Sequence, residues 1–250
     1  MLRSFSDWES KSVVRGVSRR VIVAVRTRAR TPVYFLHIGK TGGTALGKAF
    51  RALNREQSEY YFLALPHSSD LSQVPHGARY FFSVRDPLER FVSGFNSRKR
   101  HGGPGGRSPW TEAEAQAFSR FHSAHDLAQS LDPNHERFRD ALAAVQAIPH
   151  LYTMQYQYFS GEGDFLRTRP PVAIIEARKL FQSFNSMLSI LNIGERVVIP
   201  PSPETNASKT SSEGEVRGFS RLAKRNVASI YALDYLHVTT CLRFINSQSD

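Results

Sequence analysis

The sequence VYFLHIGKTGGTAL joins an apolar run to a turn that contains one lysine, two threonines and three glycines. A buried strand that leads through such a turn into a helix presents unpaired backbone N–H groups and the positive end of the helix dipole to an anion. Gly42 and Gly43 allow close approach of the backbone, and Lys40 adds a mobile positive charge. Hydroxyl groups on Thr41 and Thr44 could add further donors. The pattern favours binding of a phosphate or sulfate group over a plain Gly-Gly turn with a surface lysine.

The spacing of the glycines argues against the phosphate-binding loop of nucleoside triphosphatases. That loop requires a glycine five residues before its Gly-Lys pair, and Tyr34 occupies this position here. A kinase would also need an acidic residue that holds Mg²⁺, and no convincing candidate is found. A nucleotide-dependent kinase on a related scaffold therefore stays only as the alternative enzyme.

A second segment, RYFFSVRDPLERFVSGF, could complete an anion site. Arg85 stands at the end of its apolar run, where a guanidinium can hold a phosphate through two hydrogen bonds, and Ser93 could donate a third. An ion pair of Arg85 with Asp86 or Glu89 is the alternative. Ser93 alone would be an ordinary exposed serine on the polar side of its helix.

The two segments LHIGKTGGTAL and FFSVRDPLERFVSGF together resemble the nucleotide-binding segments of sulfotransferases that use 3′-phosphoadenosine-5′-phosphosulfate (PAPS). They are closest to the carbohydrate branch that includes the heparan sulfate 2-O and 6-O enzymes. The resemblance implies that the first segment binds the 5′-phosphosulfate, that the second binds the 3′-phosphate, and that no metal takes part. The residues implied to hold the donor are Lys40, Thr41, Gly42, Gly43, Thr44, Arg85 and Ser93. Gly39 replaces the usual proline, which loosens the turn.

Weaker similarities extend the resemblance from residue 33 to about residue 240. The segments MQYQYFSG, VAIIEARKL and IYALDYLHV are similar to further family elements. PSPETNASK resembles a late segment that closes over the nucleotide, which implies donor contacts by Asn206, Ser208 and Lys209. The same NAS triplet also reads as a glycosylation sequon.

Sulfuryl transfer would require a charged group near the leaving oxygen and a base for the acceptor hydroxyl. Lys40 and the N–H groups of the turn would stabilise the leaving oxygen. His67, in YYFLALPHSSDLS, is the predicted general base, because it precedes Arg85 by eighteen residues, similar to the place of a catalytic histidine in related enzymes. A surface histidine in a Pro-Ser turn is the alternative. His37, inside the apolar run, is predicted to be structural. The competing bases are His76, His101, His135 and Glu136.

The acceptor side carries a weaker signal. Arg98, Lys99, Arg100 and Arg107 lie around a glycine-rich loop predicted at 97–110. These cations could contact an acidic glycan or close over the donor, and a solvated basic loop explains them nearly as well. The predicted acceptor is a hydroxyl group of a glycan or glycolipid.

Apolar runs at 33–38, 80–84 and 172–175 predict three strands, each followed by a helix. Such repeats predict an α/β fold in which a P-loop-like parallel sheet is flanked by helices, with a helical insertion on the acceptor side. Ligands of these sheets lie at the carboxyl ends of the strands. The Lys40 turn and Arg85 both occupy such ends.

Capping signals locate the helices. Asp86 is the predicted N-cap of the second helix, with Glu89 as its capping-box acid. The third helix, whose apolar stripe includes Phe181, is predicted to end at Gly194. Further helices are predicted after a capping box of Thr111 and Glu114, within 132–149 and over 220–244.

Composition bounds the remaining possibilities. The chain has 250 residues, a formal net charge of +11 and one cysteine, so no internal disulfide can form.

Residues 1–31 are predicted to be a basic extension and 32–250 the sulfotransferase domain. The extension has neither the length of apolar sequence for a membrane span nor the pattern of a signal peptide. The predicted location is cytoplasmic, with a peripheral contact of the extension to an anionic surface. A non-catalytic polyanion-binding protein is a further alternative. The cations lack interleaved aromatic residues, so no nucleic-acid partner is expected.

Overall fold

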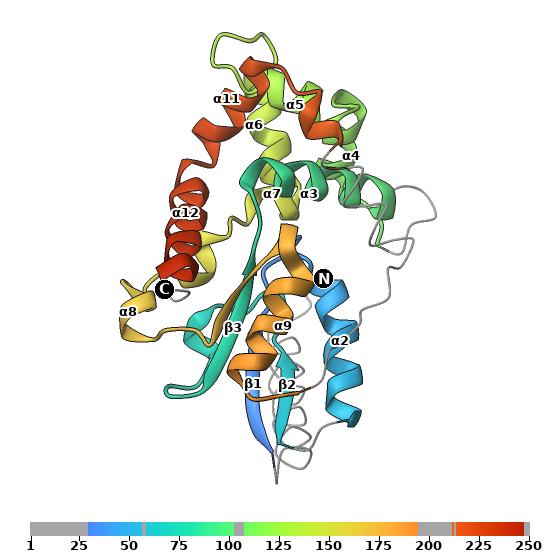
Figure 1. Ribbon diagram of the computed structural model, residues 1–250. Coiled ribbons are helices and arrows are strands. Elements are labelled where there is room, and N and C mark those ends of the chain that lie inside the picture. The colour runs from blue at the N-terminus through green and yellow to red at the C-terminus, as the bar shows by residue number, and fades with distance from the viewer. Residues whose placement is uncertain (1–29, 57–58, 103–107, 195–211, 213, 248–250) are drawn as a thin grey trace, which may run out of the picture.

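The computed structural model describes residues 30–56, 59–102, 108–194, 212 and 214–247. A sheet with helices on both faces forms one part of the molecule, and a lobe of helices packs at the end of the sheet where the strands finish (Figure 1). The chain is therefore an α/β protein, as predicted.

All four strands run parallel, in the order β2-β1-β3-β4. Their bounds are Thr31–Leu36 for β1, Tyr60–Ala64 for β2, Arg79–Val84 for β3 and Ala173–Glu176 for β4. Three of these strands were predicted, with ends shifted by one or two residues, whereas β2 was not. Because β1 and β3 are neighbours, the turn after β1 and Arg85 after β3 lie at the same edge of the sheet.

One face of the sheet is covered by α2 (Gly43–Glu56) and α9 (Leu180–Ile190). The other face is covered by η1 (Leu71–Gln73), η2 (Tyr156–Phe159), α8 (Phe165–Thr168) and α12 (Ala232–Ser247). Strands buried on both faces must be apolar throughout, which explains the unbroken apolar runs of the sequence. Each fully buried leucine or phenylalanine in these layers stabilises the fold by roughly 1.5–3 kcal/mol.

The helical lobe has a hydrophobic core of its own. Its elements are α3 (Pro87–Gly102), α4 (Glu112–Arg120), α5 (Ala124–Ser130), α6 (Phe138–Ala147), α7 (Pro149–Tyr152) and α11 (Arg221–Ile230). The predicted capping box at the start of α4 is confirmed: the Glu114 N–H donates to the Thr111 hydroxyl over 3.2 Å, and the Thr111 N–H donates to the Glu114 carboxylate over 2.8 Å.

The start of α3 is as predicted, but its end is not. The Asp86 carboxylate accepts a 3.0 Å hydrogen bond from the Glu89 N–H, so Asp86 caps the helix. The Glu89 carboxylate pairs with Arg85 and Arg178 instead of closing a capping box. The helix continues through Gly102, so the first six residues of the predicted loop 97–110 are helical.

Three other predicted helices differ from the structure. The helix predicted over 220–244 is two helices, α11 and α12, because the chain turns at the buried Tyr231, whose hydroxyl donates a 2.9 Å hydrogen bond to the Leu151 carbonyl. Helix α6 (Phe138–Ala147) forms only part of the helix predicted within 132–149. Helix α9 stops before Gly194, because Asn192 adopts a left-handed φ of 57° and closes the helix end with a 3.0 Å hydrogen bond to Ser189.

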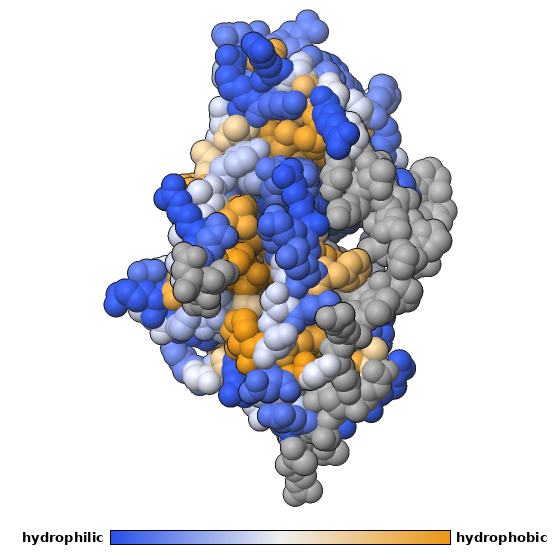
Figure 2. Space-filling model, viewed as in Figure 1, coloured by the Kyte–Doolittle hydropathy of each residue, from blue (hydrophilic) through white to orange (hydrophobic). Residues whose placement is uncertain are grey.

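The surface near α9 is more apolar than the sequence predicts. Apolar residues gather near the middle of the face shown in Figure 2, in the region of α9. Phe181, which belongs to the predicted apolar stripe of this helix, is 40% exposed. Thr31 belongs to β1 rather than to the basic extension, and residues 1–29 of that predicted extension lie outside the described residues. None of the helices that the structure describes has the length and hydrophobicity needed to cross a lipid bilayer.

Candidate active site

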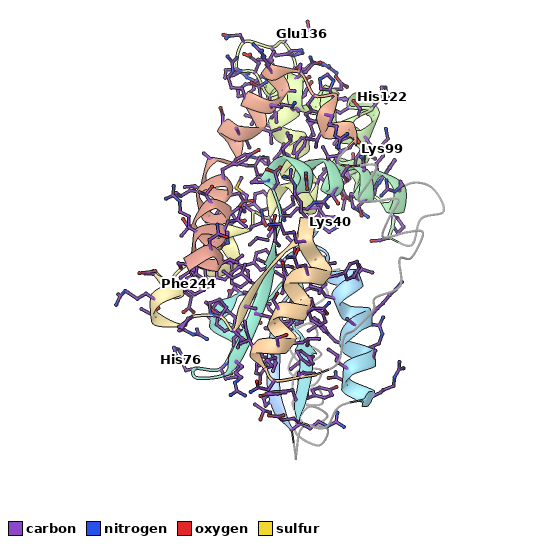
Figure 3. All side chains as sticks on the ribbon, in the orientation of Figure 1. Lys40, His76, Lys99, His122, Glu136 and Phe244 are labelled. Carbon is purple, nitrogen blue, oxygen red and sulfur yellow. The ribbon has the colours of Figure 1, made fainter. Side chains whose placement is uncertain are left out.

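The turn between β1 and α2 has an unusual backbone. Lys40 has a φ of 69° and Gly42 a φ of 102°. A left-handed conformation costs a lysine about 1 to 2 kcal/mol, whereas glycine adopts it freely. The fold holds Lys40 in this conformation where the sheet meets the helical lobe (Figure 3).

The same turn presents a row of free backbone donors. Within the part of the chain that the structure describes, the N–H groups of Lys40, Thr41, Gly42, Gly43 and Thr44 have no hydrogen-bond partner. They stand at the N-terminus of α2, a helix of 14 residues, where the helix dipole also favours negative charge. The arrangement suits a phosphate or sulfate group.

Gly42 and Gly43 are required by packing as well. A Cβ atom on Gly42 would lie 2.8 Å from Leu180 Cδ1, and a Cβ atom on Gly43 would lie 1.7 Å from His37 Nε2. The His37 ring therefore rests directly on the backbone at the start of α2. Close approach of a ligand was the reason predicted for both glycines, and close approach of these two side chains is the reason the structure provides.

The two threonines of the turn differ. Thr41 is fully buried, its hydroxyl donates to the Ile38 carbonyl over 2.8 Å, and it lies 2.7 Å from the Ser83 hydroxyl. A hydroxyl has one proton to donate, so that of Thr41 has none left for a ligand, contrary to the prediction. Thr41 can contribute only its backbone N–H. Thr44 is exposed.

Lys40 lies among other cations. Burial, and then the charges of Arg85, Arg100 and Arg90, lower the pKa of Lys40 to about 8. A bound anion would offset this repulsion and favour the charged lysine.

Arg85 lies beside this turn, as the strand order requires. Its Nη1 atom is 3.5 Å from the Lys40 carbonyl oxygen, and its Nε atom is 3.3 Å from the Glu89 carboxylate. Its backbone N–H and carbonyl are both bonded to the buried Gln155 amide, over 3.0 and 2.8 Å. The ion pair considered as an alternative for Arg85 thus exists, and it holds the guanidinium beside the turn.

Glu89 connects two arginines of the site. Its carboxylate, 3% exposed, also accepts hydrogen bonds from Arg178 Nε and Nη2, over 2.8 and 2.6 Å. Arg178 was not predicted as a site residue. Ser93 follows Glu89 by one turn of α3 and is only 4% exposed, so it is not the exposed serine considered as its alternative.

His67 approaches the turn from the segment after β2. Its Nδ1 atom is 3.2 Å from the His37 carbonyl oxygen, and the two imidazole rings are 3.8 Å apart. Burial lowers the pKa of His67, the hydrogen bond to His37 opposes this shift, and the charge of Lys40 adds to it. Because a carbonyl only accepts, this hydrogen bond places the proton on Nδ1 and leaves the lone pair on Nε2.

These residues fall within a recognised family. Residues 24–157, just over half of the chain, match the sulfotransferase family. The chain belongs to this family. Its reaction class is therefore sulfuryl transfer, as the resemblance implied. No curated protein and no solved structure matches the chain.

Two further residues of the sulfotransferase contact or face the turn, and the sequence did not point to either. Arg90 is buried on α3, and it donates from Nε to the Gly39 carbonyl over 2.9 Å and from Nη2 to the Thr153 carbonyl over 2.6 Å. His150, on α7, is far from Gly39 in the chain but close to it in space, with Nδ1 3.8 Å from where a Gly39 Cβ would be. Arg90 lies within the segment FFSVRDPLERFVSGF, but neither its contacts nor those of His150 could be inferred from local spacing.

The competing bases lie elsewhere in the sulfotransferase. Figure 3 shows His76 near one end of the molecule and Glu136 near the other, both far from Lys40. His135 neighbours Glu136 in the chain, and its Nδ1 accepts a 3.1 Å hydrogen bond from the Arg137 N–H. The side chain of His101 is outside the described residues. His67 is thus the predicted base that the fold brings to the turn.

Two cations of the predicted basic loop are hydrogen-bonded to protein oxygen atoms. Arg98 forms an ion pair with Glu114 and donates to the carbonyls of Ser108 and Pro109, over 2.8 and 3.0 Å. Lys99 donates to the His122 carbonyl. These two cations join α3 to the region of α4 instead of facing an acceptor. Arg107, and the predicted donor contacts Asn206, Ser208 and Lys209, lie outside the described residues.

Proposed function

We propose that this sulfotransferase takes its sulfuryl group from PAPS and transfers it to a hydroxyl group of a glycan or glycolipid. The observation that carries the proposal is the row of five N–H groups from Lys40 to Thr44, which have no partner among the described residues and lie next to the Lys40 ammonium. PAPS supplies an activated sulfuryl group and, as that group leaves, a phosphate oxygen that gains negative charge.

The residues present fit such a donor. Backbone donors at a helix N-terminus suit the 5′ end, where the charge develops. Arg85 suits the 3′-phosphate, because Nη2 is without a partner among the described residues while Nε and Nη1 are held in place. Ser93 is its proposed companion. Asn206, Ser208 and Lys209 are proposed from the resemblance alone.

Lys40 would stabilise the leaving oxygen. With a pKa of about 8, Lys40 is mainly charged at neutral pH, and a neighbouring phosphate would keep it so. Its side chain is partly buried, which strengthens electrostatic interactions relative to those in water. A neutral imidazole at the turn would take the proton of the acceptor hydroxyl, and His67, through Nε2, is the candidate predicted from sequence.

The acceptor class rests on the resemblance to the carbohydrate branch. Arg100 lies close enough to lower the pKa of Lys40 and could contact an acidic group on the acceptor. A peripheral contact of the basic extension with an anionic membrane would suit a glycolipid. Family membership favours this function over the kinase and the polyanion-binding protein.

Thermal unfolding with adenosine 3′,5′-bisphosphate, the desulfated product, tests the donor. A ligand at a hundred times its dissociation constant stabilises the folded state by about 2.7 kcal/mol, a clear increase in Tm. We expect this increase with the bisphosphate and not with ADP plus Mg²⁺. Arg85→Ala should abolish it, and Arg167→Ala, whose side chain is 78% exposed, should not. Stabilisation by ADP plus Mg²⁺ alone would support the kinase, and no stabilisation by either ligand would refute the donor assignment.

A further inference from the structure

The side-chain amide of Gln155 takes the place of a neighbouring strand beside Arg85. The pairing of β3 with β1 ends at Phe82 and its pairing with β4 ends at Val84, so the N–H and carbonyl groups of Arg85 lie beyond the sheet. Gln155 Oε1 accepts a hydrogen bond from the Arg85 N–H over 3.0 Å, and Gln155 Nε2 donates one to the Arg85 carbonyl over 2.8 Å. These two bonds fix the backbone of Arg85 just past the end of its strand.

Glutamine is the residue type that this position requires. A planar amide carries an acceptor and a donor side by side, whereas an ionised carboxylate only accepts and an apolar side chain does neither. Gln155 is fully buried, so its polar atoms cannot turn to solvent instead. Loss of the amide would leave the N–H and carbonyl of Arg85 without these partners, and the backbone would have to shift to regain others.

The backbone of Gln155 is itself anchored on two sides. The next N–H group, that of Tyr156, donates a 3.0 Å hydrogen bond to the buried carboxylate of Asp234 on α12. Phe159 packs on Phe82 of β3, with the two ring centroids 4.7 Å apart. The amide of Gln155 therefore extends from a fixed point of the core.

The segment around Gln155 also holds the turn at Gly39. The Tyr158 hydroxyl accepts a 3.4 Å hydrogen bond from the Gly39 N–H, an interaction that the usual proline could not make. Arg90 donates to the carbonyls of Gly39 and Thr153, over 2.9 and 2.6 Å. One segment thus holds both parts of the proposed donor site, and with them the distance between the two phosphate groups that they would bind.

We propose that Gln155 is a positioning residue that makes the site selective for a nucleotide with a 3′-phosphate. The inference rests on the proposed function and deepens its account of the donor. Gln155 fixes the backbone of Arg85. Glu89 and the Lys40 carbonyl then hold Nε and Nη1 of the guanidinium, and Nη2 has no partner among the described residues. A guanidinium held in this way would bind the 3′-phosphate while the Lys40 turn binds the 5′-phosphate.

The test measures the binding of two nucleotides, adenosine 3′,5′-bisphosphate and adenosine 5′-monophosphate, by isothermal titration calorimetry. Gln155→Met keeps the approximate size of the side chain and removes both hydrogen bonds. We expect it to weaken binding of the bisphosphate by about tenfold, the scale of a misplaced hydrogen bond to a charged group, and binding of the monophosphate by less than about twofold. Gln157→Met is the matched control, because Gln157 lies in the same segment and its Oε1 accepts a 2.8 Å hydrogen bond from the Met154 N–H. The control should leave the preference for the bisphosphate unchanged.

Equal losses for the two nucleotides in Gln155→Met would show that the amide only supports the fold, and would overturn the inference. Unchanged affinities, or the same loss of preference in Gln157→Met, would overturn it as well. A wild type that fails to bind the bisphosphate would refute the proposed donor and the inference together.

Gln155→Glu carries the test if Gln155→Met does not fold. The ionised carboxylate accepts from the Arg85 N–H but offers no donor to the Arg85 carbonyl, whereas the protonated acid can restore both hydrogen bonds. Relative to the wild type at the same pH, the preference of this variant for the bisphosphate should be lower at about pH 8 and recover at about pH 5. A preference that is lowered equally at both pH values, or that equals the wild type at both, would overturn the inference.

Discussion

The two ends of α3 carry cations that look alike in the sequence but differ in which donors remain available. At the start, Arg85 is placed by Gln155 and Glu89 and keeps one terminal nitrogen without a partner among the described residues. It lies beside the Lys40 turn, whose backbone N–H groups also have no partner among the described residues. An anion at this end of α3 would meet donors that no hydrogen bond among the described residues occupies.

At the far end, Arg98 and Lys99 are already bound to protein oxygen atoms. Arg98 donates hydrogen bonds to Glu114 and to two carbonyl groups, and Lys99 donates one to the His122 carbonyl. An acidic ligand would have to displace these partners. A cluster of positive residues therefore indicates a binding site only where donors remain without a partner, and substitutions at the two ends should have opposite effects.

The largest expected effect is that of Lys40→Gly. Loss of a donor aimed at the leaving oxygen should lower turnover by about 10²- to 10³-fold. The free energy of unfolding should rise by up to about 1 kcal/mol, because glycine adopts the φ of 69° without strain. Chemical denaturation and turnover of PAPS measure both effects. In the control Lys48→Gly, on the exposed side of α2, we expect unchanged turnover and a loss of about 1 kcal/mol. Equal turnover in the two variants would contradict the role of Lys40.

The next effect belongs to the other end of α3. Arg98→Ala should lower the free energy of unfolding by about 3 kcal/mol, because it leaves the Glu114 carboxylate, 1% exposed, without its cation. Bisphosphate affinity should not change. The double variant Arg98→Met/Glu114→Leu should recover only part of the lost stability, since a buried apolar pair needs no partner but the Thr111 N–H loses its capping-box acceptor. A large loss of donor affinity in Arg98→Ala, with stability intact, would reverse the comparison between the two ends.

Local signals in the sequence were sufficient for much of the fold. The strands β1, β3 and β4 and the capping box at Thr111 follow from apolar runs and from side chains within three residues of each other. The proximity of Lys40 and Arg85 followed because parallel strands end at one edge of a sheet. Strand β2 was missed because its apolar run is short and, unlike those of β1, β3 and β4, it is not followed by a helical pattern.

The remainder of the site depends on contacts between distant segments. His150 reaches the turn only because α7 packs on Gly94, and Arg98 is engaged only because Glu114 lies on the neighbouring helix. Likewise, the hydroxyl of Thr41 is unavailable because Ser83 stands opposite on β3. No spacing in the sequence reveals such pairs.

Gly43→Ala tests the packing beneath the Lys40 turn. The added methyl group would lie 1.7 Å from His37 Nε2, so the His37 ring must move. We expect a loss of about 1 to 3 kcal/mol in the free energy of unfolding. Because the His37 carbonyl binds His67, the ring signals of His67 should shift in NMR spectra as well. Gly47→Ala, in the same helix and with no atom closer than 4.0 Å, should be neutral or stabilising. Equal stability of both variants would show that His37 does not rest on Gly43.

The smallest effect is a pH dependence that separates the two ends of α3 once more. With a folded pKa of about 8 against an ordinary 10.5, Lys40 binds fewer protons in the folded chain than in the unfolded chain between these two values. Its contribution to the free energy of unfolding therefore rises with pH across this window. A bound phosphate favours the charged lysine, so bisphosphate affinity should fall above pH 8, by at most about tenfold per pH unit. The difference in Tm between free and bound protein, measured from pH 7 to 10, should narrow.

In Lys40→Arg, whose side chain stays charged, the difference in Tm should remain constant, and in Arg98→Ala it should narrow as in the wild type. A difference that is independent of pH in all three proteins would place Lys40 outside the anion site.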